Sequence, residues 1–351
     1  MIEAQVDPRA IRPIELRELT LENNLVLAPM AGVSSLPFRL ISKEAGAALT
    51  FTETVSAKGL VMGGHKTRRL LETSPREAPV AFQLFGSDPQ ILGEACRHLD
   101  GAGAAWIDLN VGCPVKKFIK NRAGSSLLRD LPRAAAIVRE MRRNFGGTLS
   151  VKMRTGWDSE NITAPQFAKI AVAEGAELLS VHGRTRVQQY TGRADREIIR
   201  QVVECVPEVP VLANGDILGP DDVFDMLRDT GAAGVMIGRG AMGNPWIFEQ
   251  TLALARGGAL RGPTLEDRFA TIERHVGWIV EAFDDPRSLA TNLKKYLFSY
   301  SKGLRGSALF RQNILEADDV DEILALTRSF FLSRDERSSD EAVEPGAERA
   351  A

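Results

Sequence analysis

Cysteine is scarce in this sequence. The 351 residues include only Cys96, Cys113 and Cys205, an odd number with no CxxC spacing. This pattern argues against a disulfide framework and against a structural zinc site, so we expect no bound metal. Any chemistry at cysteine must therefore come from a single thiol.

Long apolar runs are also missing. No run approaches the roughly 18 residues that a bilayer crossing requires. The first residues, MIEAQVDPRAIRPIEL, carry charges where a signal peptide would have its apolar core. We therefore expect a soluble cytoplasmic protein that does not contact membranes. Nothing in the sequence implies an obligate protein partner, and both a monomer and a dimer remain open.

The net charge is small as well, because 44 lysines and arginines nearly balance 46 aspartates and glutamates. A chain with a net charge of −2 has no indiscriminate attraction for nucleic acid, so an RNA partner would need basic residues gathered on one face. Three basic stretches without any acid span residues 55–71, 110–129 and 178–193. For each stretch taken singly, chance clustering on solvated loops is the alternative.

Short β-rich runs recur eight times, each followed by an amphipathic segment of helical length. The runs are Val26–Gly32, Leu49–Ser56, Pro79–Gly86, Trp106–Pro114, Leu149–Gly156, Leu178–Thr185, Pro210–Asp216 and Gly234–Gly240. Eight repeats of strand and helix predict an α/β fold, a closed parallel (β/α)8 TIM barrel, with a doubly wound sheet as the competing fold. Active sites of such barrels lie at the C-terminal ends of the strands, and the basic stretches follow the second, fourth and sixth runs.

The chain is long enough for one barrel of about 250 residues and a smaller domain. We expect residues 1–257 to form the barrel, 258–263 a linker and 264–333 an all-α domain with its last helix ending near Ser333. Residues 334–351 are charged and poor in large apolar side chains, so we expect a disordered tail. Thr264 is predicted to cap a helix that runs towards Phe283.

A basic segment lies within the expected C-terminal domain. Residues 287–311 contain six lysines and arginines and no acid, and their leucines and tyrosines recur at helical spacing. Lys295, Lys302 and Arg305 fall away from this apolar stripe of the predicted helix. They are our candidates for contacts with RNA phosphates, with simple solvation of the helix as the alternative.

The most informative segment is DLNVGCPVKKFIKNRAGSSLLRD, which places Cys113 at a strand end between glycine and proline. APMAGVSSLPFR, QLFG, NVGCP, KMRTGW, HGRT, ANGDI and IGRGAMGNPWIF occur in an order and spacing that resemble the motifs of the tRNA-dihydrouridine synthase family, especially its bacterial B branch. The resemblance covers residues 26–333. One such motif would be weak evidence, whereas seven in register are strong.

The resemblance implies an enzyme that carries FMN and reduces a uracil in the D-loop of tRNA. Hydride would pass from reduced FMN to C6, a proton to C5, and NADPH, with NADH as the alternative, would reduce the flavin again. Cys113 matches the family's proton donor. A thiol with a pKa near 8.5 is mostly protonated at neutral pH and can act as an acid without tuning. A nucleophilic cysteine, which usually has a paired base, and a buried structural cysteine are the alternatives.

The resemblance also assigns a set of strand-end residues to FMN. They are Pro29, Met30, Ala31, Gln83, Lys152, His182, Asn214, Gly215, Asp216, Gly238 and Arg239. Lys152 would stabilise the anionic form of the reduced flavin, and the loops after the seventh and eighth strands would hold the phosphate. A salt bridge and a pyridoxal-binding lysine are the alternatives for Lys152, and a structural role is the alternative for His182.

Asn110 resembles the family residue that hydrogen-bonds the inserted uracil, and Arg154 is a second candidate for the same pocket. The uracil must leave its stack to reach a flavin inside a barrel, which costs a few kcal/mol and least in an irregular loop. Phosphate contacts from the basic stretches would then orient the tRNA.

Two rival functions explain part of the sequence. A small-molecule FMN barrel acting on a free pyrimidine such as dihydroorotate accounts for the flavin motifs and Cys113, but not for the basic segment 287–311. A regulatory RNA-binding protein without turnover would have no use for Cys113 and Lys152.

Overall fold

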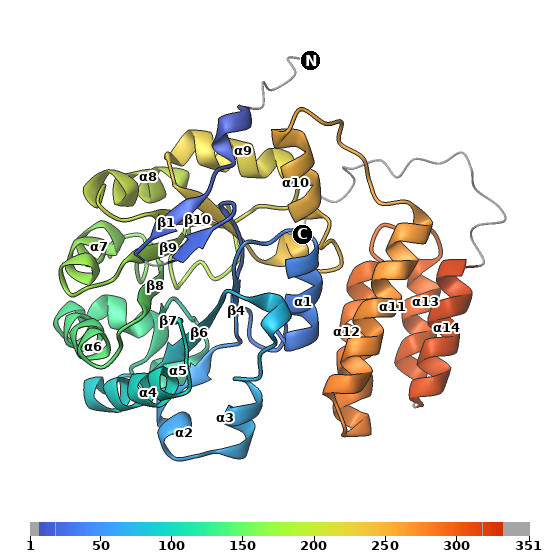
Figure 1. Ribbon diagram of the computed structural model, residues 1–351, viewed down its shortest axis with the longest axis horizontal. Coiled ribbons are helices and arrows are strands. Elements are labelled where there is room, and N and C mark those ends of the chain that lie inside the picture. The colour runs from blue at the N-terminus through green and yellow to red at the C-terminus, as the bar shows by residue number, and fades with distance from the viewer. Residues whose placement is uncertain (1–6, 18, 318, 333–351) are drawn as a thin grey trace. The chain divides into compact units, whose positions relative to one another are not determined.

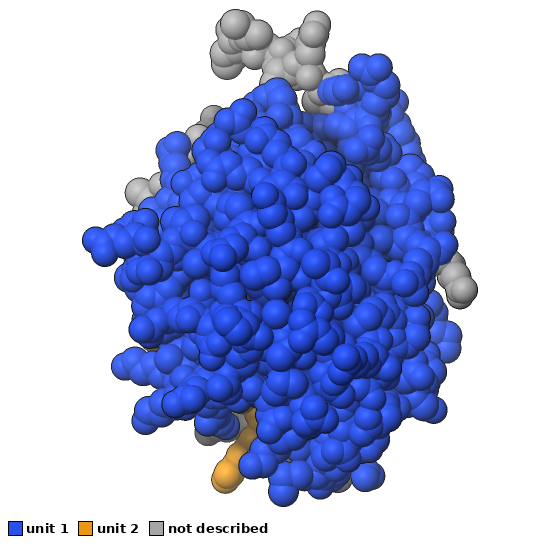
Figure 2. Space-filling view, turned by 90° about the vertical axis from the view of Figure 1, so that its left-hand side faces the viewer, with its two compact units in different colours: residues 1–241, 247–260 blue, residues 242–246, 261–351 orange. Residues whose placement is uncertain are grey.

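The computed structural model describes residues 7–17, 19–317 and 319–332 (Figure 1). Ser333 and the expected tail, residues 334–351, lie outside these ranges. The chain divides into two compact units. Unit 1 contains the described residues up to Ala241 together with Ile247–Leu260, and unit 2 contains Met242–Trp246 together with the described residues from Arg261 onward (blue and orange in Figure 2).

Unit 1 is a (β/α)8 barrel, as the sequence predicts. Its parallel strands within the described ranges are β3 (Leu25–Leu27), β4 (Thr50–Phe51), β6 (Val80–Phe85), β7 (Trp106–Val111), β8 (Thr148–Arg154), β9 (Leu178–His182), β10 (Val211–Asn214) and β11 (Gly234–Ile237). They are hydrogen-bonded in the order β3-β11-β10-β9-β8-β7-β6-β4, and β5 (Val55–Ser56) pairs with β6. The ring closes between β3 and β4, because the N–H of Leu27 donates to the carbonyl of Leu49 at 2.9 Å. This closure excludes the doubly wound sheet, which is open.

The strands end earlier than the sequence pattern predicts. β3 stops at Leu27 rather than Gly32, and β10 stops at Asn214 rather than Asp216. Gly215 and Asp216 have φ angles of 126° and 52°, a left-handed backbone that a strand does not adopt. The polar residues at these ends therefore lie on loops at the C-terminal end of the barrel.

A short antiparallel hairpin, which the sequence pattern did not reveal, precedes the barrel. Its strands are β1 (Ile14–Leu16) and β2 (Leu19–Leu21). Ile14, Leu16 and Leu21 pack with Trp106 and Leu178, the first residues of β7 and β9, in one buried cluster. The hairpin thus covers the N-terminal ends of the strands. Three-residue strands are too short to show a reliable alternation.

Helices surround the barrel strands (Figure 1). They are α1 (Leu36–Glu44), α2 (Ala57–Val61), α3 (His65–Arg69), α4 (Pro89–Gly101), α5 (Lys116–Lys120), α6 (Leu131–Arg143), α7 (Ala164–Ala173), α8 (Arg196–Cys205), α9 (Pro220–Thr230) and α10 (Ile247–Ala255). Short 3-10 helices are η1 (Pro8–Ala10), η2 (Pro75–Glu77), η3 (Gly124–Arg129) and η4 (Arg239–Ala241). Aspartates at the N-caps of α4, α6 and α8 accept backbone N–H groups of the first turn, which stabilises these helix starts.

Unit 2 is helical and consists of α11 (Leu265–Ala282), α12 (Pro286–Tyr300), α13 (Ser307–Glu316) and α14 (Val320–Leu332). Thr264 caps α11 as predicted, because its side chain accepts from the N–H of Asp267. Residues 242–246 belong to this unit, where Trp246 packs edge-on against Tyr300 with a centroid distance of 6.0 Å. No helix in the described ranges is both long and apolar enough to cross a bilayer.

The prediction of one helix across the basic segment 287–311 is wrong. α12 ends at Tyr300, and Gly303 and Gly306 then adopt φ angles of 72° and 73°, which break the helical path before α13. Lys302 and Arg305 are therefore exposed on a turn and not on a helix face.

Candidate functional site

A pocket lies at the C-terminal ends of the barrel strands, where the sequence predicts the site. Nine of the residues predicted to bind FMN line it: Pro29, Met30, Lys152, His182, Asn214, Gly215, Asp216, Gly238 and Arg239. Tyr190, from the loop after β9, also lines the pocket and was not predicted. Among the described residues no group of three or more histidines, cysteines, aspartates and glutamates could hold a metal ion.

Lys152, on β8, joins two other strands across the pocket. Its Nζ donates to Oδ1 of Asn214 at 3.1 Å, and Nδ2 of Asn214 donates to the carbonyl of Met236 at 2.6 Å. Burial lowers the pKa of Lys152 to about 8; Arg154 lowers it as well, and Asp108 opposes the shift. At neutral pH the amine is still a cation, and it is bonded to an amide rather than to a carboxylate. This arrangement disfavours the barrel-mouth salt bridge considered from the sequence.

His182, the last residue of β9, is an uncharged imidazole. Burial lowers its pKa well below the usual value, and the cations of Lys152, Arg154, Arg184 and Arg239 add to the effect. Its Nε2 lies 3.4 Å from Nη1 of Arg184, and arginine only donates, so Nε2 accepts and Nδ1 carries the proton.

Two arginines meet one carboxylate at the loops after β10 and β11. Asp216 is paired with Arg184, which is 2% exposed, at 2.8 Å, and Arg239 lies 3.7 Å from the same carboxylate. Two guanidinium groups thus face one carboxylate, which leaves local positive charge. A Cβ on Gly240 would lie 2.1 Å from the carbonyl oxygen of Ile217, so only glycine allows the two loops to approach this closely. These residues fit a flavin phosphate.

Cys113 is half-buried on a clamped turn after β7. Its N–H donates to Oδ1 of Asn110 at 2.9 Å, and its carbonyl accepts from Oγ of Ser125 at 2.9 Å. Gly124, with φ of 61°, lies so close that a Cβ there would be 2.9 Å from the same carbonyl oxygen. Burial raises the pKa of the thiol. The N–H of Val115 and the positive charges of Arg154 and Lys152 lower this pKa, but burial has the larger effect, so the thiol is protonated at neutral pH.

The remaining predicted residues lie outside the pocket lining. Ala31 is exposed on the loop after β3, whereas Gln83 and Asn110 are 1% and 8% exposed and bonded to each other. Arg154 is 2% exposed, and its guanidinium donates to the carbonyls of Gly112, Thr185 and Gln189. It braces the loops after β7 and β9 against each other.

Ser34 shapes the loop that carries Met30. Its Oγ accepts from the N–H of Met30 at 2.9 Å and donates to the carbonyl of Ala28 at 3.0 Å. Arg39, on α1, donates to the carbonyl of Ser34 at 2.8 Å. The loop therefore has one defined path past the pocket.

Tyr190 is the clearest omission of the sequence prediction. The guanidinium carbon of Arg239 lies 4.6 Å from the centroid of its ring, and the ring of His182 lies at 6.2 Å. An aromatic residue with 55% exposure at a pocket edge can cover a bound ring. Its place within an acid-free stretch after HGRT was a usable signal.

The basic stretches are not uniformly available to RNA. Contrary to expectation, Arg184 is buried and paired, because two carbonyls and Asp216 take its donors. Arg129 and Arg186 lie 4.7 and 4.8 Å from the ring of Trp157. Exposed cations remain on the first two stretches and at the end of the third: Lys58, Arg68, Lys116, Lys117, Lys120, Arg122 and Arg193.

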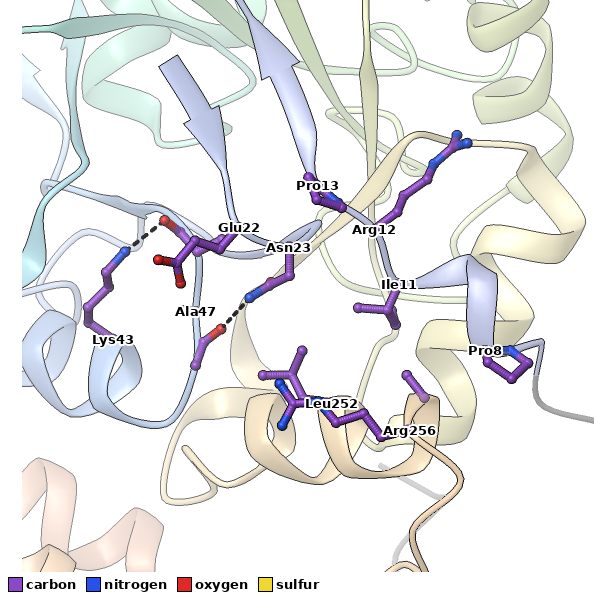
Figure 3. A pocket seen from close by; sticks show the side chains of 13 residues that line it. Pro8, Ile11, Arg12, Pro13, Glu22, Asn23, Lys43, Ala47, Leu252 and Arg256 are labelled. Atoms are coloured by element: carbon purple, nitrogen blue, oxygen red, sulfur yellow. Dashed lines mark hydrogen bonds between the residues drawn. The ribbon is translucent and has the colours of Figure 1, made fainter.

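A second cavity, of about 320 Å³, lies beside the N-terminal ends of β3 and β4 (Figure 3). Within it, Nζ of Lys43 donates to the carbonyl of Ala48 at 2.8 Å, and Nδ2 of Asn23 donates to that of Gly46 at 3.1 Å. These two side chains thus hold the loop before β4. Since barrel enzymes place their chemistry at the opposite end, this cavity is not the candidate active site.

The comparisons with known proteins point to one family. A family model described as dihydrouridine synthase matches residues 26–334. The tRNA-dihydrouridine synthase B of Xanthomonas campestris pv. campestris is 38% identical over 319 residues, which cover 91% of this chain and 96% of that protein. The probable tRNA-dihydrouridine synthase of Treponema pallidum is 35% identical over 325 residues, covering 90% and 95%.

Solved structures share the fold. The structure of TcOYE with pHBA superposes with a TM-score of 0.55 at 11% identity, covering 75% of this chain and 97% of that one. Histamine dehydrogenase from Rhizobium sp. 4-9 gives a TM-score of 0.53 at 13% identity, covering 70% and 47%. At these identities the likeness supports the barrel fold alone.

Proposed function

This chain belongs to the dihydrouridine synthase family, and from that premise we propose that it reduces a D-loop uridine of tRNA to 5,6-dihydrouridine, with bound FMN and with NADPH as reductant. The observation that carries the proposal is a protonated thiol, Cys113, which lies outside the pocket lining but within the field of Lys152, a residue of a pocket whose loops fit a flavin phosphate. The names of the related proteins support the substrate class.

The pocket residues divide the binding of FMN between them. Gly215, Gly238 and Arg239 would hold the phosphate, while Pro29 and Met30 would contact the ring. When bound, FMN supplies the hydride that reduces the uracil ring. Lys152 offers a cation that favours negative charge on the reduced flavin, and neutral His182 offers an N–H donor without adding charge.

Cys113 supplies the proton. Its S–H donates to C5 of the uracil while a hydride adds to C6, and the thiolate that remains lies within the field of Lys152 and Arg154, which favour its negative charge. Asn110 would hold the uracil, and the clamped turn fixes the backbone that carries the Cys113 thiol.

Binding of tRNA falls to the exposed cations. In unit 1 these include Lys116, Lys117 and Lys120 on α5, directly after Cys113. We assign unit 2 as a tRNA-binding domain, with Lys302 and Arg305 as phosphate contacts. Lys295 is a weaker candidate, because it is bonded to Asn292 and lies over the ring of Tyr296.

Mapping dihydrouridine in tRNA from cells lacking this protein tests the proposal. We expect one or more D-loop positions to revert to uridine, and expression of the wild-type chain to restore them. Restoration by Cys113→Ala would point to a role without turnover. Unchanged tRNA together with altered levels of a free pyrimidine would favour the small-molecule rival.

A further inference from the structure

A carboxylate lies inside the barrel, behind the proposed site. Asp108, on β7, is completely buried and accepts two hydrogen bonds. Oγ of Ser150 donates to it at 2.6 Å, and Nε2 of Gln83 donates to it at 2.8 Å. No role in the proposed reaction uses this group, although an unneeded buried carboxylate would be costly.

At one end of this chain of contacts, an indole N–H fixes the direction of a hydrogen bond. Nε1 of Trp106 donates to Oγ of Ser150 at 2.9 Å, and an indole N–H can only donate. Oγ of Ser150 therefore accepts from Trp106, and its own hydrogen remains available for Asp108. When Asp108 is ionised, Ser150 and Gln83 both donate to it.

At the other end the chain reaches the Cys113 turn. Oε1 of Gln83 accepts from Nδ2 of Asn110 at 2.7 Å. Oδ1 of Asn110 then accepts from the N–H groups of Gly112 and Cys113, at 3.1 and 2.9 Å. A flip of the Gln83 amide would bring two N–H groups together and would force Asn110 to turn as well.

We propose that Asp108 is a positioning residue, which acts through Gln83 and Asn110 to orient the substrate base and the Cys113 turn. Oδ1 of Asn110 is used by two backbone N–H groups and one hydrogen of Nδ2 is used by Gln83, so Asn110 has a single N–H left for a substrate base. That N–H can donate to a carbonyl oxygen of uracil. Cytosine has an amino group at the position of the uracil O4, and two donors there would repel each other. This inference rests on the proposed function for the identity of the base.

The ionised form of Asp108 is the stronger acceptor for both of its neighbours. Burial raises its pKa to about 6, against the bonds from Ser150 and Gln83 and the positive charge of Lys152 on β8, the charged group that faces it. A protonated Asp108 can turn its O–H towards Oγ of Ser150, but its other oxygen is then a weaker acceptor for Gln83 than a carboxylate oxygen is. The orientation of Asn110 is therefore held most firmly above about pH 6, and this hold weakens as the pH falls through that value.

The test follows two signals by NMR in the flavin-loaded full-length protein from pH 5 to 8. These are the indole N–H of Trp106 and the side-chain amide of Asn110, assigned with Trp106→Phe and Asn110→Ser. We expect both to shift with one midpoint near pH 6. In Asp108→Asn, which cannot titrate, both shifts should disappear. In Ser150→Ala, which removes one bond to the carboxylate, the Asn110 midpoint should move to higher pH. If the Asn110 signal does not shift with the titration of Asp108, the proposal is wrong, whether or not the enzyme is active.

The pH profile of dihydrouridine formation gives the second readout. The acid limb of kcat/KM should share the NMR midpoint in the wild type, move upward in Ser150→Ala and vanish in Asp108→Asn. At pH 8 Ser150→Ala should remain within about threefold of the wild type, because Asp108 still accepts from Gln83. Asp108→Leu, which offers no acceptor, should lose at least tenfold while retaining FMN. If the acid limb of the pH profile were the same in all variants, Asp108 would have only a structural role. If no variant, including the wild type, formed dihydrouridine at any pH, the proposed function itself would be wrong.

Discussion

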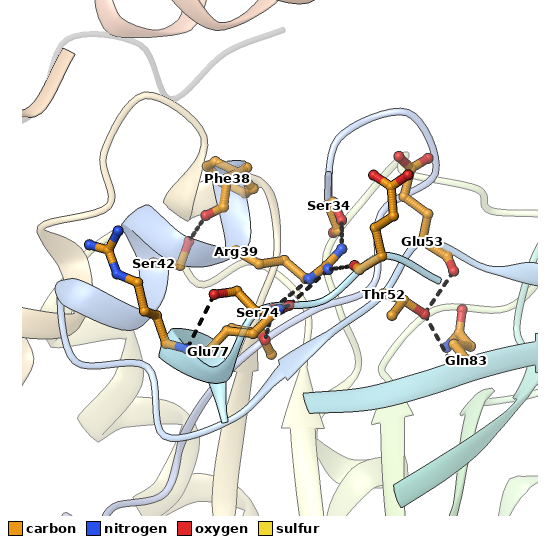
Figure 4. Close-up of polar contacts among 12 residues, drawn as sticks. Ser34, Phe38, Arg39, Ser42, Thr52, Glu53, Ser74, Glu77 and Gln83 are labelled. Atoms are coloured by element: carbon orange, nitrogen blue, oxygen red, sulfur yellow. Dashed lines mark hydrogen bonds and ion pairs between the residues drawn. The ribbon is translucent and has the colours of Figure 1, made fainter. Parts of the chain in front are cut away.

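Arg39 and Glu77 form a two-pronged ion pair inside unit 1, with N–O distances of 2.7 and 3.0 Å and side chains that are 2% and 0% exposed (Figure 4). Thr50 and the N–H of Ser74 also donate to the carboxylate, and Arg39 donates to the carbonyl of Ser34. The pair joins α1, η2 and β4 beneath the loop that carries Met30.

Breaking this pair should be strongly destabilising. Arg39→Met leaves Glu77 charged and buried without its partner, so we expect the free energy of unfolding of unit 1 to fall by about 3–5 kcal/mol. The double variant Arg39→Met/Glu77→Leu should recover part of this loss. Arg76→Met is the control, since its ion pair with Glu44 is exposed and should be worth less than about 1 kcal/mol. Urea unfolding measures the free energy of unfolding of each variant. Equal decreases in Arg39→Met and Arg76→Met would contradict the prediction.

Removal of the Cys113 thiol should separate flavin chemistry from product formation. Cys113→Ala should bind FMN and oxidise NADPH normally, yet form dihydrouridine at least tenfold more slowly, because general acid catalysis contributes about 10²- to 10⁴-fold. Cys205→Ala is the matched control, since that thiol donates to carbonyls around α8, away from the pocket lining. Turnover of Cys113→Ala close to that of wild type would remove Cys113 from the mechanism.

FMN affinity should depend on pH through Lys152. The pKa of this amine is lowered to about 8 in the ligand-free pocket, so below pH 8 the pocket holds the cation and binds anionic FMN fully. As the pH rises above 8 the free protein loses that charge, and affinity should fall by up to tenfold per pH unit until the bound form titrates. Lys152→Met should bind more weakly at pH 7 and lose this dependence. Fluorescence titration of FMN measures both effects. If the affinity of Lys152→Met for FMN still fell above pH 8, the pH dependence would come from another group.

The exposed cations of unit 2 should determine part of the salt dependence of tRNA binding. Neutralising Lys302 and Arg305 to Gln should flatten the plot of log affinity against log salt by about 1.4 to 1.8, because each phosphate contact contributes roughly 0.7 to 0.9. Lys294→Gln is the control, since its Nζ donates to the carbonyls of Leu315 and Ala317 and is not free for RNA. Flavin content should be unchanged in all variants. Parallel plots for the double variant and wild type would show that the tRNA is held elsewhere.

Much of the fold followed from local patterns. The eight strands could be located because strands and helices have different periodicities, and each repeat carries its own signal. The predicted strand ends were too long, since glycine and polar residues such as Gly215 and Asp216 leave the β region without interrupting the apolar pattern. The break in the basic segment depends on Gly303 and Gly306, whose left-handed backbone the helical spacing did not reveal.

The sequence by itself determined the barrel, the end of the barrel that carries the polar residues, and nine of the residues that line its pocket, because in a parallel barrel every strand end points to the same mouth. Only the tertiary structure decided which of those polar groups are free to bind. Arg154 donates to backbone carbonyls, and Arg184 donates to Asp216. Gln83 donates to Asp108. A sequence states how many donors and acceptors a residue has, whereas the partners that use them come from strands and loops far apart in the chain.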